Sequence, residues 1–262
     1  MAKYAIGFIG AGKMAEGIVS AMASRETVVM AEKDGDRRRF MAERYGVETV
    51  PDAKEAIGKA DIAFLAVRPQ DVAGVAAELG ALPSGKTLVS IAAGKKLETL
   101  RGLFGEACGL VRVMPNLALR ARAGMCAICA APGTPPAHLE AVREILSAAG
   151  ETTVLEERHF DAVTALGGSG PAYFAYMQKS MAEAGRALGL DKASADLIAA
   201  QTMFGTAKYL RESGADLEKF IEGVCTKGGT TEAGMRRLAA GAFDEAVRET
   251  IAAAAARSAE LG

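Results

Sequence analysis

The chain has 262 residues, of which 50% are hydrophobic and 24% are charged, a composition typical of a folded globular protein and unlike that of a disordered one. Its 31 basic and 32 acidic residues leave a net charge of -1, which argues against a nucleic-acid-binding protein. No apolar run reaches the roughly 18 residues of a membrane span, and no signal-peptide pattern opens the sequence. We therefore expect a cytoplasmic protein that binds neither nucleic acid nor a membrane.

Short apolar runs alternate with amphipathic helical patterns from residue 4 to about residue 155. Several of these runs are apolar without alternation, which is typical of strands buried on both faces of a sheet. The runs expected as strands are Tyr4–Ile9, Thr27–Ala31, Asp61–Val67, Lys86–Ile91, Leu110–Met114, Met125–Ala131 and Thr152–Leu155. With helical patterns between them, such as Lys13–Ser24 and Gly35–Tyr45, this order predicts an α/β Rossmann-type domain with a parallel sheet over residues 1–155.

The first expected strand runs into a glycine-rich turn with the pattern G-x-G-x-x-A, formed by Gly10, Gly12 and Ala15. Gly10 permits a tight turn, and Gly12 lets the main chain approach a pyrophosphate above the N-terminus of the next helix. The turn therefore predicts dinucleotide binding, although an ordinary tight turn without a ligand is the alternative. The residues of the turn expected at the dinucleotide are Gly10, Ala11, Gly12, Lys13 and Met14.

The second expected strand ends at Glu32, 22 residues after Gly10, where an acidic side chain binds the adenosine ribose of NAD. Basic residues follow directly and could instead hold the 2′-phosphate of NADP, or form a solvated helix face. These residues are Lys33, Arg37, Arg38 and Arg39. The two signals oppose each other, so this segment predicts a dinucleotide and leaves the choice between NAD and NADP open.

Three further strand ends are candidates for the same crevice, because parallel sheets bind ligands at the carboxyl ends of their strands. Small residues after the strand that ends near Ile91 leave room for a nicotinamide ring. The candidates are Val67, Arg68 and Pro69, then Ala92, Ala93 and Gly94, and then Pro115 and Asn116.

The cysteines and histidines give no sign of a metal site or a catalytic triad. Cys126 and Cys129 lie three residues apart in an expected strand, which places their thiols on opposite faces, so we interpret them as buried structural residues. His138 and His159 stand beside acidic, helix-like sequence, and we interpret both as surface or boundary residues.

After about residue 156 the strand-like runs stop and good helix formers dominate. Helical patterns lie near 157–166, 171–189, 192–212, 215–224, 231–240 and 243–260. Asp191 and Thr230 are expected as helix N-caps. The segment Ile251–Ala256 is apolar almost all round, which indicates burial, against a second chain as one alternative. An all-α domain over residues 156–262 is therefore predicted.

Six segments read together resemble the pyrroline-5-carboxylate reductase family over nearly the whole chain. They are Gly7–Ala15, Ala66–Gln70, Ser90–Gly94, Arg112–Asn116, Ala165–Tyr173 and Cys225–Thr231. The resemblance implies reduction of L-1-pyrroline-5-carboxylate to L-proline, the last step of proline biosynthesis. It implies NADPH as the hydride donor, with NADH as the alternative. It also implies that the helical domain forms a homodimer and binds substrate, with a higher oligomer such as a decamer left open.

The segment Gly228–Thr231 opens an expected helix, so its main-chain N–H groups suit a small anion. By resemblance this loop holds the substrate carboxylate, and the hydroxyl of Thr231, the expected catalytic residue, faces the ring nitrogen. The expected substrate-binding residues are Ser169, Thr226, Gly228, Gly229, Thr230 and Thr231. The alternatives are that Thr230 and Thr231 only cap the helix, and that Ser169 only precedes a helix starting near Pro171.

Two other functions stay open at this stage. A dehydrogenase of the β-hydroxyacid type has a similar layout and uses a lysine in its helical domain, for which Lys179 is the candidate. A non-enzymatic dinucleotide-sensing module would keep the glycine turn and have no use for Gly228–Thr231. No metal is expected in any of these cases.

Overall fold

The computed structural model describes residues 4–25 and 27–261. They form two compact units, which we call unit 1 (up to Ser169, together with the residues from Ala254) and unit 2 (Gly170–Ala253). The boundary expected after residue 155 lies inside unit 1. The reason is that Phe160 is buried in the core of unit 1, and that the Asp161 carboxylate accepts a hydrogen bond from Ser258 at 2.7 Å.

Unit 1 is built on an eight-stranded sheet with the order β3-β2-β1-β4-β5-β6-β7-β8. The strands are β1 (Ile6–Ile9), β2 (Val28–Ala31), β3 (Glu48–Val50), β4 (Ile62–Leu65), β5 (Thr87–Ser90), β6 (Gly109–Pro115), β7 (Gly124–Ala130) and β8 (Gly150–Val154). The seven expected strands are confirmed, with ends that differ by a few residues. The sequence did not predict β3, because this short edge strand has polar residues at two of its three positions.

The sequence had suggested a wholly parallel sheet, and this prediction is wrong for one strand. β7 runs antiparallel to β6, while the other neighbouring strands of the described chain are parallel. The link from β6 to β7 contains one short helical turn, η2 (Leu117–Ala121). A parallel connection needs about a dozen residues or more, so this link is too short to return the chain to the starting edge.

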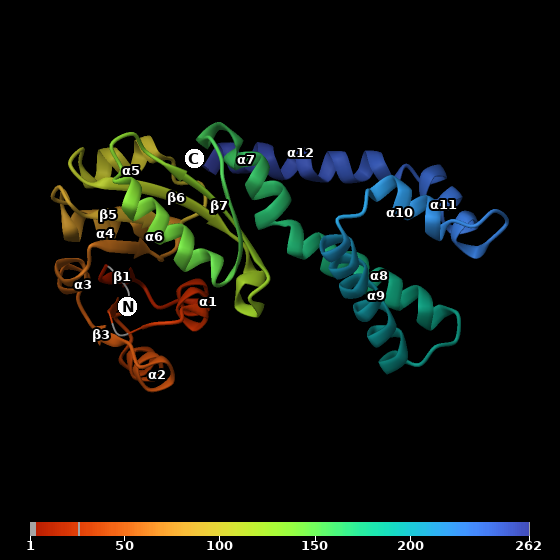
Figure 1. Ribbon diagram of the computed structural model, residues 1–262, viewed down its shortest axis with the longest axis horizontal. Helices are drawn as coiled ribbons and strands as arrows, with labels where there is room; N and C mark the ends of the chain where they lie inside the picture. The colour runs from red at the N-terminus through yellow and green to blue at the C-terminus, as the bar shows by residue number, and fades with distance from the viewer. Residues whose placement is uncertain (1–3, 26, 262) are drawn as a thin grey trace. The chain divides into compact units, whose positions relative to one another are not determined.

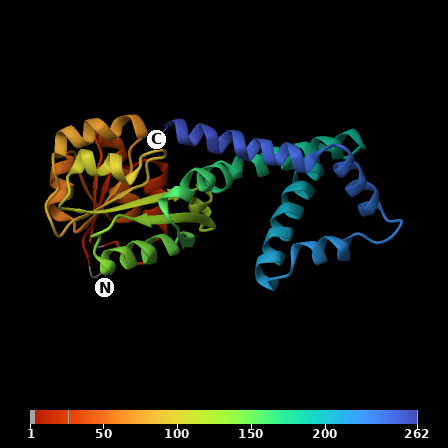
Figure 2. The same ribbon diagram turned by 90° about the horizontal axis from the view of Figure 1, so that it is seen from above.

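Helices cover both faces of the sheet (Figures 1 and 2). One face carries α1 (Lys13–Ala21), α2 (Gly35–Tyr45) and α6 (Pro136–Ser147), and the other carries α3 (Ala53–Lys59), α4 (Val72–Leu79), α5 (Leu97–Phe104) and α7 (Phe160–Val163). Aspartates cap two of these helices: Asp34 accepts from the first-turn N–H groups of α2, and Asp52 does so for α3. The sheet is therefore buried on both sides, which explains strands that are apolar without alternation.

The two core clusters confirm the interpretation of the cysteines and correct that of one histidine. Cys126 packs in the cluster of α1 and α6, whereas Cys129 packs in the cluster on the opposite face. Burial raises the pKa of the Cys126 thiol to about 11. His138 is buried, with its Nδ1 atom 2.8 Å from the hydroxyl of Thr87, so it is not a surface residue. His159 is exposed, as expected.

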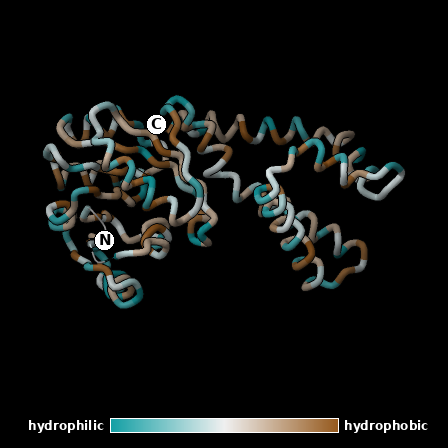
Figure 3. Tube along the Cα trace, in the orientation of Figure 1, coloured by the Kyte–Doolittle hydropathy of each residue, from teal (hydrophilic) through white to brown (hydrophobic). Residues whose placement is uncertain are grey.

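Unit 2 is helical and contains α8 (Gly170–Ala187), α9 (Lys192–Ser213), α10 (Leu217–Val224), α11 (Thr230–Ala240) and most of α12 (Phe243–Leu261). Asp191 is confirmed as an N-cap, because its carboxylate accepts a hydrogen bond from the N–H of Ser194. Hydrophobic and hydrophilic segments alternate along these helices (Figure 3). No helix within residues 4–25 and 27–261 is both long and apolar enough to cross a bilayer.

The apolar side chains of unit 2 are mostly not buried in the single chain. Its described cluster of buried apolar residues consists of Ala182, Ala195 and Ala199. Large apolar side chains that are exposed include Phe174, Tyr176, Leu197, Ile198, Phe204, Tyr209, Leu217, Ile221, Met235 and Leu238. The segment Ile251–Ala256 is half-buried or exposed, not fully buried, in this chain alone.

Candidate active site

A cavity of about 650 Å³ lies at the carboxyl ends of β1, β2 and β4. β1 stands between β2 and β4, so the cavity is at the point where the strand order reverses, which is where such sheets bind ligands. The residues that line it are Ile9, Gly10, Gly12, Ala31, Glu32, Lys33, Pro51, Ala53, Ala66, Val67, Arg68, Gln70, Asp71, Gly74, Val75 and Glu78. The structure thus brings together six of the expected dinucleotide residues, from three separate strand ends.

The two glycines of the turn differ in their local surroundings. Gly10 has φ +95°, and a Cβ there would lie 2.8 Å from the carbonyl oxygen of Ala66. Gly12 has an extended backbone that any residue adopts, and a Cβ there would meet no atom within 4 Å. Neither the backbone nor packing therefore requires a glycine at position 12. Open space in front of this main chain fits the close approach of a pyrophosphate.

The N-terminus of α1 is also suited to an anion. Gly12 is its N-cap and offers no side-chain hydrogen bond, so the first main-chain N–H groups of the helix have no side-chain cap. Ala15 is fully buried, which agrees with close packing of helix on strand. Lys13 is exposed and Met14 is half-buried, and neither lines the cavity.

Ala11 is held by side chains from the second strand end and from α2. Its N–H donates to the carboxylate of Glu32 at 3.0 Å, and its carbonyl oxygen accepts from Nε of Arg37 at 2.7 Å. Arg37 also donates to Glu16 at 2.6 Å, and Tyr45 donates to the same carboxylate at 2.9 Å. Burial raises the pKa of Glu16, but the hydrogen bonds from Arg37 and Tyr45 outweigh burial and hold this pKa below its ordinary value.

The strand end after β4 supplies Val67 and Arg68 to the cavity, while Pro69 begins the short helix η1 (Pro69–Asp71) and does not line it. The sequence missed the cavity residues that lie just after β3, at the start of α3, in η1 and in α4, namely Pro51, Ala53, Gln70, Asp71, Gly74, Val75 and Glu78. Gln70 and Asp71 directly follow Arg68, so their position in the same loop was a usable signal. Glu78 lies ten residues after Arg68, and only the packing of α4 brings it to the cavity.

Ala92, Ala93 and Gly94 lie outside this cavity. The room expected beside Gly94 is taken by the end of α12, because a Cβ on Gly94 would lie 3.0 Å from the carbonyl oxygen of Leu261. Gly94 has φ +75°, which independently favours glycine. Ala92 is buried and Ala93 is exposed. Of this group, Ala93 alone presents a freely accessible side chain in the described structure.

Pro115 and Asn116, expected at the coenzyme, also lie outside the cavity. Pro115 is a buried residue at the end of β6. The side-chain amide of Asn116 donates to the carbonyl oxygen of Gly167 at 3.2 Å and accepts from the N–H of Met125 at 3.2 Å. Asn116 therefore joins the start of β7 to the helical segment η4 (Thr164–Gly168).

That segment also corrects the interpretation of Ser169. Residues Thr164–Gly168 form a π-helical turn between α7 and α8, so no new helix starts from a loop here. The N–H of Ser169 donates to the carbonyl oxygen of Thr164 at 2.9 Å and is not available to an anion. The expected anion-binding turn before Pro171 is therefore absent from the described helix. A substrate contact by the hydroxyl of Ser169 stays a prediction.

In unit 2, the loop that precedes α11 has the geometry of a helix N-terminus without a side-chain cap. Gly229, not Thr230, is the N-cap, so the capping interpretation of the two threonines is wrong. Gly228 has φ +75°, and a Cβ on Gly229 would lie 2.6 Å from Oγ1 of Thr226. Both positions therefore favour glycine for local reasons. Thr230 is exposed and Thr231 is half-buried.

The sequence analysis missed Glu232 in this loop. Its carboxylate accepts from the N–H of Gly228 at 2.6 Å and from the Arg236 guanidinium at 2.7 Å. A Glu at the third helical position often reaches back over a helix N-terminus, as in a capping box, although here it binds the N–H before the N-cap; its spacing was a usable signal. The N–H of Gly229 is bonded to the carbonyl oxygen of Thr226. The first-turn N–H groups of Thr230 and Thr231 have no side-chain cap.

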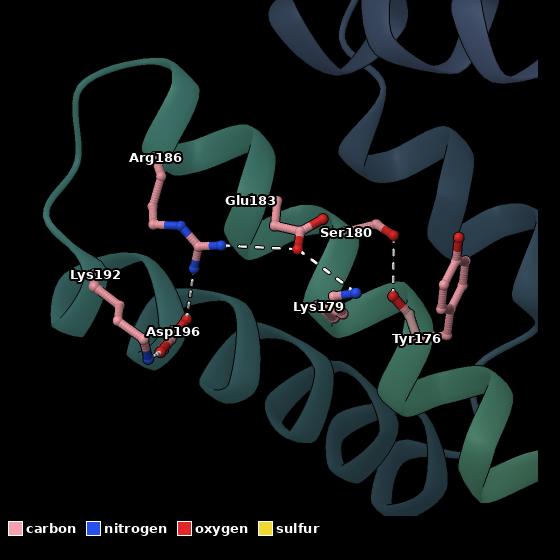
Figure 4. A network of polar contacts seen from close by, with 7 residues as sticks. All are labelled: Tyr176, Lys179, Ser180, Glu183, Arg186, Lys192 and Asp196. Atoms are coloured by element: carbon pink, nitrogen blue, oxygen red, sulfur yellow. Dashed lines mark hydrogen bonds and ion pairs between the residues drawn. The ribbon is translucent and has the colours of Figure 1, made fainter.

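Lys179, the candidate proton donor of the dehydrogenase alternative, lies in a surface network (Figure 4). Its ammonium is 3.7 Å from the carboxylate of Glu183, and its side chain is 64% exposed. Arg186 lies between Glu183 and Asp196 and approaches both carboxylates. An exposed ion pair one helical turn apart is ordinary surface chemistry, so Lys179 shows no sign of a catalytic environment.

Comparison with known proteins accounts for both parts of the chain. A family model described as pyrroline-5-carboxylate reductase dimerisation matches residues 157–261, and one described as NADP oxidoreductase coenzyme F420-dependent matches residues 5–94. The pyrroline-5-carboxylate reductase 2 of Bacillus subtilis is 35% identical, with 98% of this chain and 94% of that protein covered. The pyrroline-5-carboxylate reductase of Synechocystis is 36% identical, with 98% of each covered.

Comparison with solved structures agrees with the comparison of sequences. A solved pyrroline-5-carboxylate reductase from Coxiella burnetii superposes with a TM-score of 0.94 at 29% identity, covering 99% of this chain and 98% of that one. The glycine turn and the oxidoreductase model that covers it define an NAD(P)H-dependent oxidoreductase. The full-length relatives narrow this class: the chain belongs to the pyrroline-5-carboxylate reductase family. The model matched over residues 5–94 is described as one of NADP oxidoreductases, which supports a nicotinamide dinucleotide as the coenzyme.

Proposed function

We propose that this chain performs the reaction for which its family is named, reducing the C=N bond of L-1-pyrroline-5-carboxylate to give L-proline, the last step of proline biosynthesis. The observation that carries the proposal is identity of 35–36% to named reductases over 98% of the chain, so that both the turn at Gly12 and the loop at Gly228–Thr231 fall inside the match. We place the reaction in the cytoplasm.

The dinucleotide, when bound, supplies the hydride. The chain's own contribution in unit 1 is to bind and orient it. The open main chain at Gly12 and the uncapped start of α1 suit the pyrophosphate, and Glu32 with Lys33 reaches the adenosine end. The further strand-end residues proposed at the coenzyme are Val67, Arg68, Pro69, Ala92, Ala93, Gly94, Pro115 and Asn116. The last five lie outside the cavity, and we propose them for the nicotinamide end because they follow β5 and β6, whose carboxyl ends lie at the same edge of the sheet as that of β4.

In unit 2, the uncapped N-terminus of α11 suits the substrate carboxylate, since the N–H groups of Thr230 and Thr231 have no side-chain acceptor. We assign Thr231 as the hydrogen-bonding partner of the ring nitrogen. The hydroxyl donates to the lone pair of the nitrogen, and this bond strengthens as reduction of the C=N bond raises the electron density on the nitrogen; an interaction of that kind raises kcat. Ser169, Thr226, Gly228 and Gly229 complete the proposed substrate site.

We further propose that two copies associate through unit 2 and that each site needs both copies, with dimers assembling into a higher oligomer such as a decamer as an extension. The exposed apolar side chains of unit 2 support the dimer, because one chain alone leaves them in water. Mixing Gly12→Val subunits with Thr231→Ala subunits tests the shared site. Recovery of activity in the mixed protein supports it, and no recovery contradicts it.

The experiment on function itself is steady-state reduction of pyrroline-5-carboxylate with NADPH and with NADH, set against oxidation of 3-hydroxyacids. We expect turnover with the imine alone. Thr231→Ala should lower kcat by about 5- to 150-fold, the cost of one lost hydrogen bond of about 1–3 kcal/mol, while dinucleotide affinity stays within about twofold. Thr230→Ala, at the exposed neighbouring threonine, is the matched control and should change kcat much less.

Two results would contradict this assignment. An unchanged kcat in Thr231→Ala would remove Thr231 from the chemistry. Turnover of 3-hydroxyacids that is lost in Lys179→Met would favour the dehydrogenase alternative, which the surface position of Lys179 does not support.

A further inference from the structure

The charged residues around the adenosine end of the cavity carry one more inference, which rests on the proposed function because it concerns its coenzyme. We propose that Glu32 discriminates against a 2′-phosphate, so that this chain binds NADH more tightly than NADPH. The matched family model describes NADP oxidoreductases in general, whereas this discrimination depends on side chains of this particular chain.

Glu32 stands directly after β2 and lines the cavity. Two main-chain donors hold its carboxylate: one oxygen accepts from the N–H of Ala11 at 3.0 Å, and the other accepts from the N–H of Asp34 at 3.1 Å. A carboxylate oxygen has two lone-pair sites, so each oxygen can accept one more hydrogen bond. The Glu32 carboxylate is therefore held in one position and can still accept hydrogen bonds, which suits the hydroxyl groups of a ribose.

Each of the two cations in the cavity lining lies beside an acid, and both pairs are at the surface, with the Lys33 side chain 87% exposed. Lys33 lies 3.8 Å from the carboxylate of Glu78, and Arg68 donates to Asp71 at 2.8 Å. All four of these residues line the cavity, as Glu32 does. Three acids and two bases leave the lining with a net negative charge. A phosphate placed there would add to this negative charge without meeting an unpaired cation of the lining.

The arginines that follow β2 in sequence are directed to other partners. Arg37 binds the Ala11 carbonyl oxygen and Glu16, and Arg39 lies 3.4 Å from Asp36 on the surface. Arg38 donates from one nitrogen to the carbonyl oxygens of Glu32 and Lys33, at 2.6 and 2.9 Å. These last bonds tie Arg38 to the main chain that carries Glu32. Arg38 is the one arginine of this row without a carboxylate partner in the described structure, so it is the residue that a contrary result would implicate.

The physical consequence is a difference between the two coenzymes at a single position. The 2′-hydroxyl of NADH donates to a carboxylate, whereas the 2′-phosphate of NADPH is an anion that the same carboxylate repels at close range. We therefore expect the dissociation constant of NADH to be lower than that of NADPH by at least about tenfold at low salt, a difference that added salt reduces.

The test is equilibrium binding of NADH and NADPH to the full-length protein, followed by the fluorescence of the reduced nicotinamide. Glu32→Gln keeps the size of the side chain and removes its charge, and should lower the preference for NADH by about tenfold. Glu78→Gln removes an acid of the same cavity that is ion-paired with Lys33, and should change the preference by less. Thermal melting of each variant shows that it is folded. Binding of AMP and of adenosine 2′,5′-bisphosphate repeats the comparison without the nicotinamide.

The outcomes are distinct. The inference is overturned if NADPH binds the parent protein more tightly than NADH does and this preference is lost in Arg38→Gln. Arg38 would then be the residue that binds the 2′-phosphate. An unchanged ratio in Glu32→Gln also overturns it. Binding of neither dinucleotide would overturn the proposed function together with the inference. Binding of both without reduction of the imine would overturn the function alone.

Discussion

Units 1 and 2 bury their apolar residues to very different extents. Unit 1 encloses a core on both faces of its sheet, where Phe8 and Phe64 are fully buried and stack on each other at 4.8 Å. The described apolar cluster of unit 2 contains three alanines, while Phe174, Leu197 and Phe204 are each more than 60% exposed. One chain therefore suffices to complete the core of unit 1, and the apolar surface of unit 2 requires another chain to cover it.

This difference also separates the two chemical tasks. The cavity proposed for the dinucleotide is formed within unit 1, whose apolar core is enclosed in a single chain. The helix start proposed for the substrate lies in unit 2, whose packing is not complete. Burying a large apolar side chain contributes about 1.5–3 kcal/mol, so several such residues on unit 2 would together favour association strongly.

The largest effect is expected from a charge placed on the apolar surface of unit 2. Phe204→Asp should convert the protein to a monomer and lower turnover by at least roughly 100-fold, because an unpaired buried charge costs about 3–5 kcal/mol at an interface. Dinucleotide binding by unit 1 should stay within about threefold of the parent. Light scattering gives the mass, and fluorescence titration gives the affinity.

Lys192→Gln is the matched control for Phe204→Asp, since it lies on the same helix, changes the net charge by the same amount and affects a side chain that is 79% exposed. It should leave both mass and turnover unchanged. A Phe204→Asp protein with full activity and the parent mass would mean that the exposed face of α9 does not contact a second copy.

A second contrast lies inside unit 1, between two glycines five residues apart. Gly12→Val should weaken dinucleotide binding by about tenfold or more without lowering stability, because its side chain would project into open space in front of the helix. Gly7→Ala should do the reverse: its Cβ would lie 2.8 Å from that of Ala60, and such overpacking costs about 1–3 kcal/mol.

Thermal melting and coenzyme titration of both glycine variants measure the stability and the coenzyme affinity separately. The two variants should change different quantities, one the affinity and the other the melting temperature. Parent-like affinity in Gly12→Val would assign the turn to structure alone.

The smallest effect concerns pH and the contact between α1 and α2. Because the folded-state pKa of Glu16 is held below its ordinary value, its stabilising contribution is complete above that ordinary value and is lost as the pH falls through the lowered pKa. Glu16→Gln should therefore lower the free energy of unfolding by about 1–3 kcal/mol at pH 7 and by less near pH 4. Urea unfolding at both pH values measures this, and an equal loss at both would contradict it.

Local patterns were sufficient to predict much of unit 1. The periodicity of short apolar runs predicted seven of its eight strands, and the turn at Gly10 and Gly12 predicted where the cavity lies. The direction of β7 was not predicted, although the shortness of the link after Pro115 was visible in the sequence. Burial of His138 depends on its contact with Thr87, which is 51 residues away along the chain.

The rest of the site depends on tertiary packing that no local pattern records. Glu78 reaches the cavity because of how α4 packs on the sheet, and Leu261 reaches Gly94 from the far end of the sequence. The proposed substrate loop was found from its glycines, but their local roles differ from those expected. Gly228 has a positive φ and Gly229 is the N-cap. The N–H of Gly228, which was expected to bind the ligand, donates instead to the carboxylate of Glu232.

The way in which residues from Ala254 onward rejoin unit 1 has a consequence for how the protein is made. Unit 2 is an insertion of 84 residues, Gly170–Ala253, between two parts of unit 1. At about 5–20 residues per second, a ribosome needs about 4–17 s to synthesise this insertion after Ser169 has been added. During that interval Asp161 lacks its partner Ser258 and Gly94 lacks the cover of Leu261. The nascent chain therefore begins the helices of unit 2 before unit 1 is complete, and unit 1 gains its last helical segment only after Leu261 has been added.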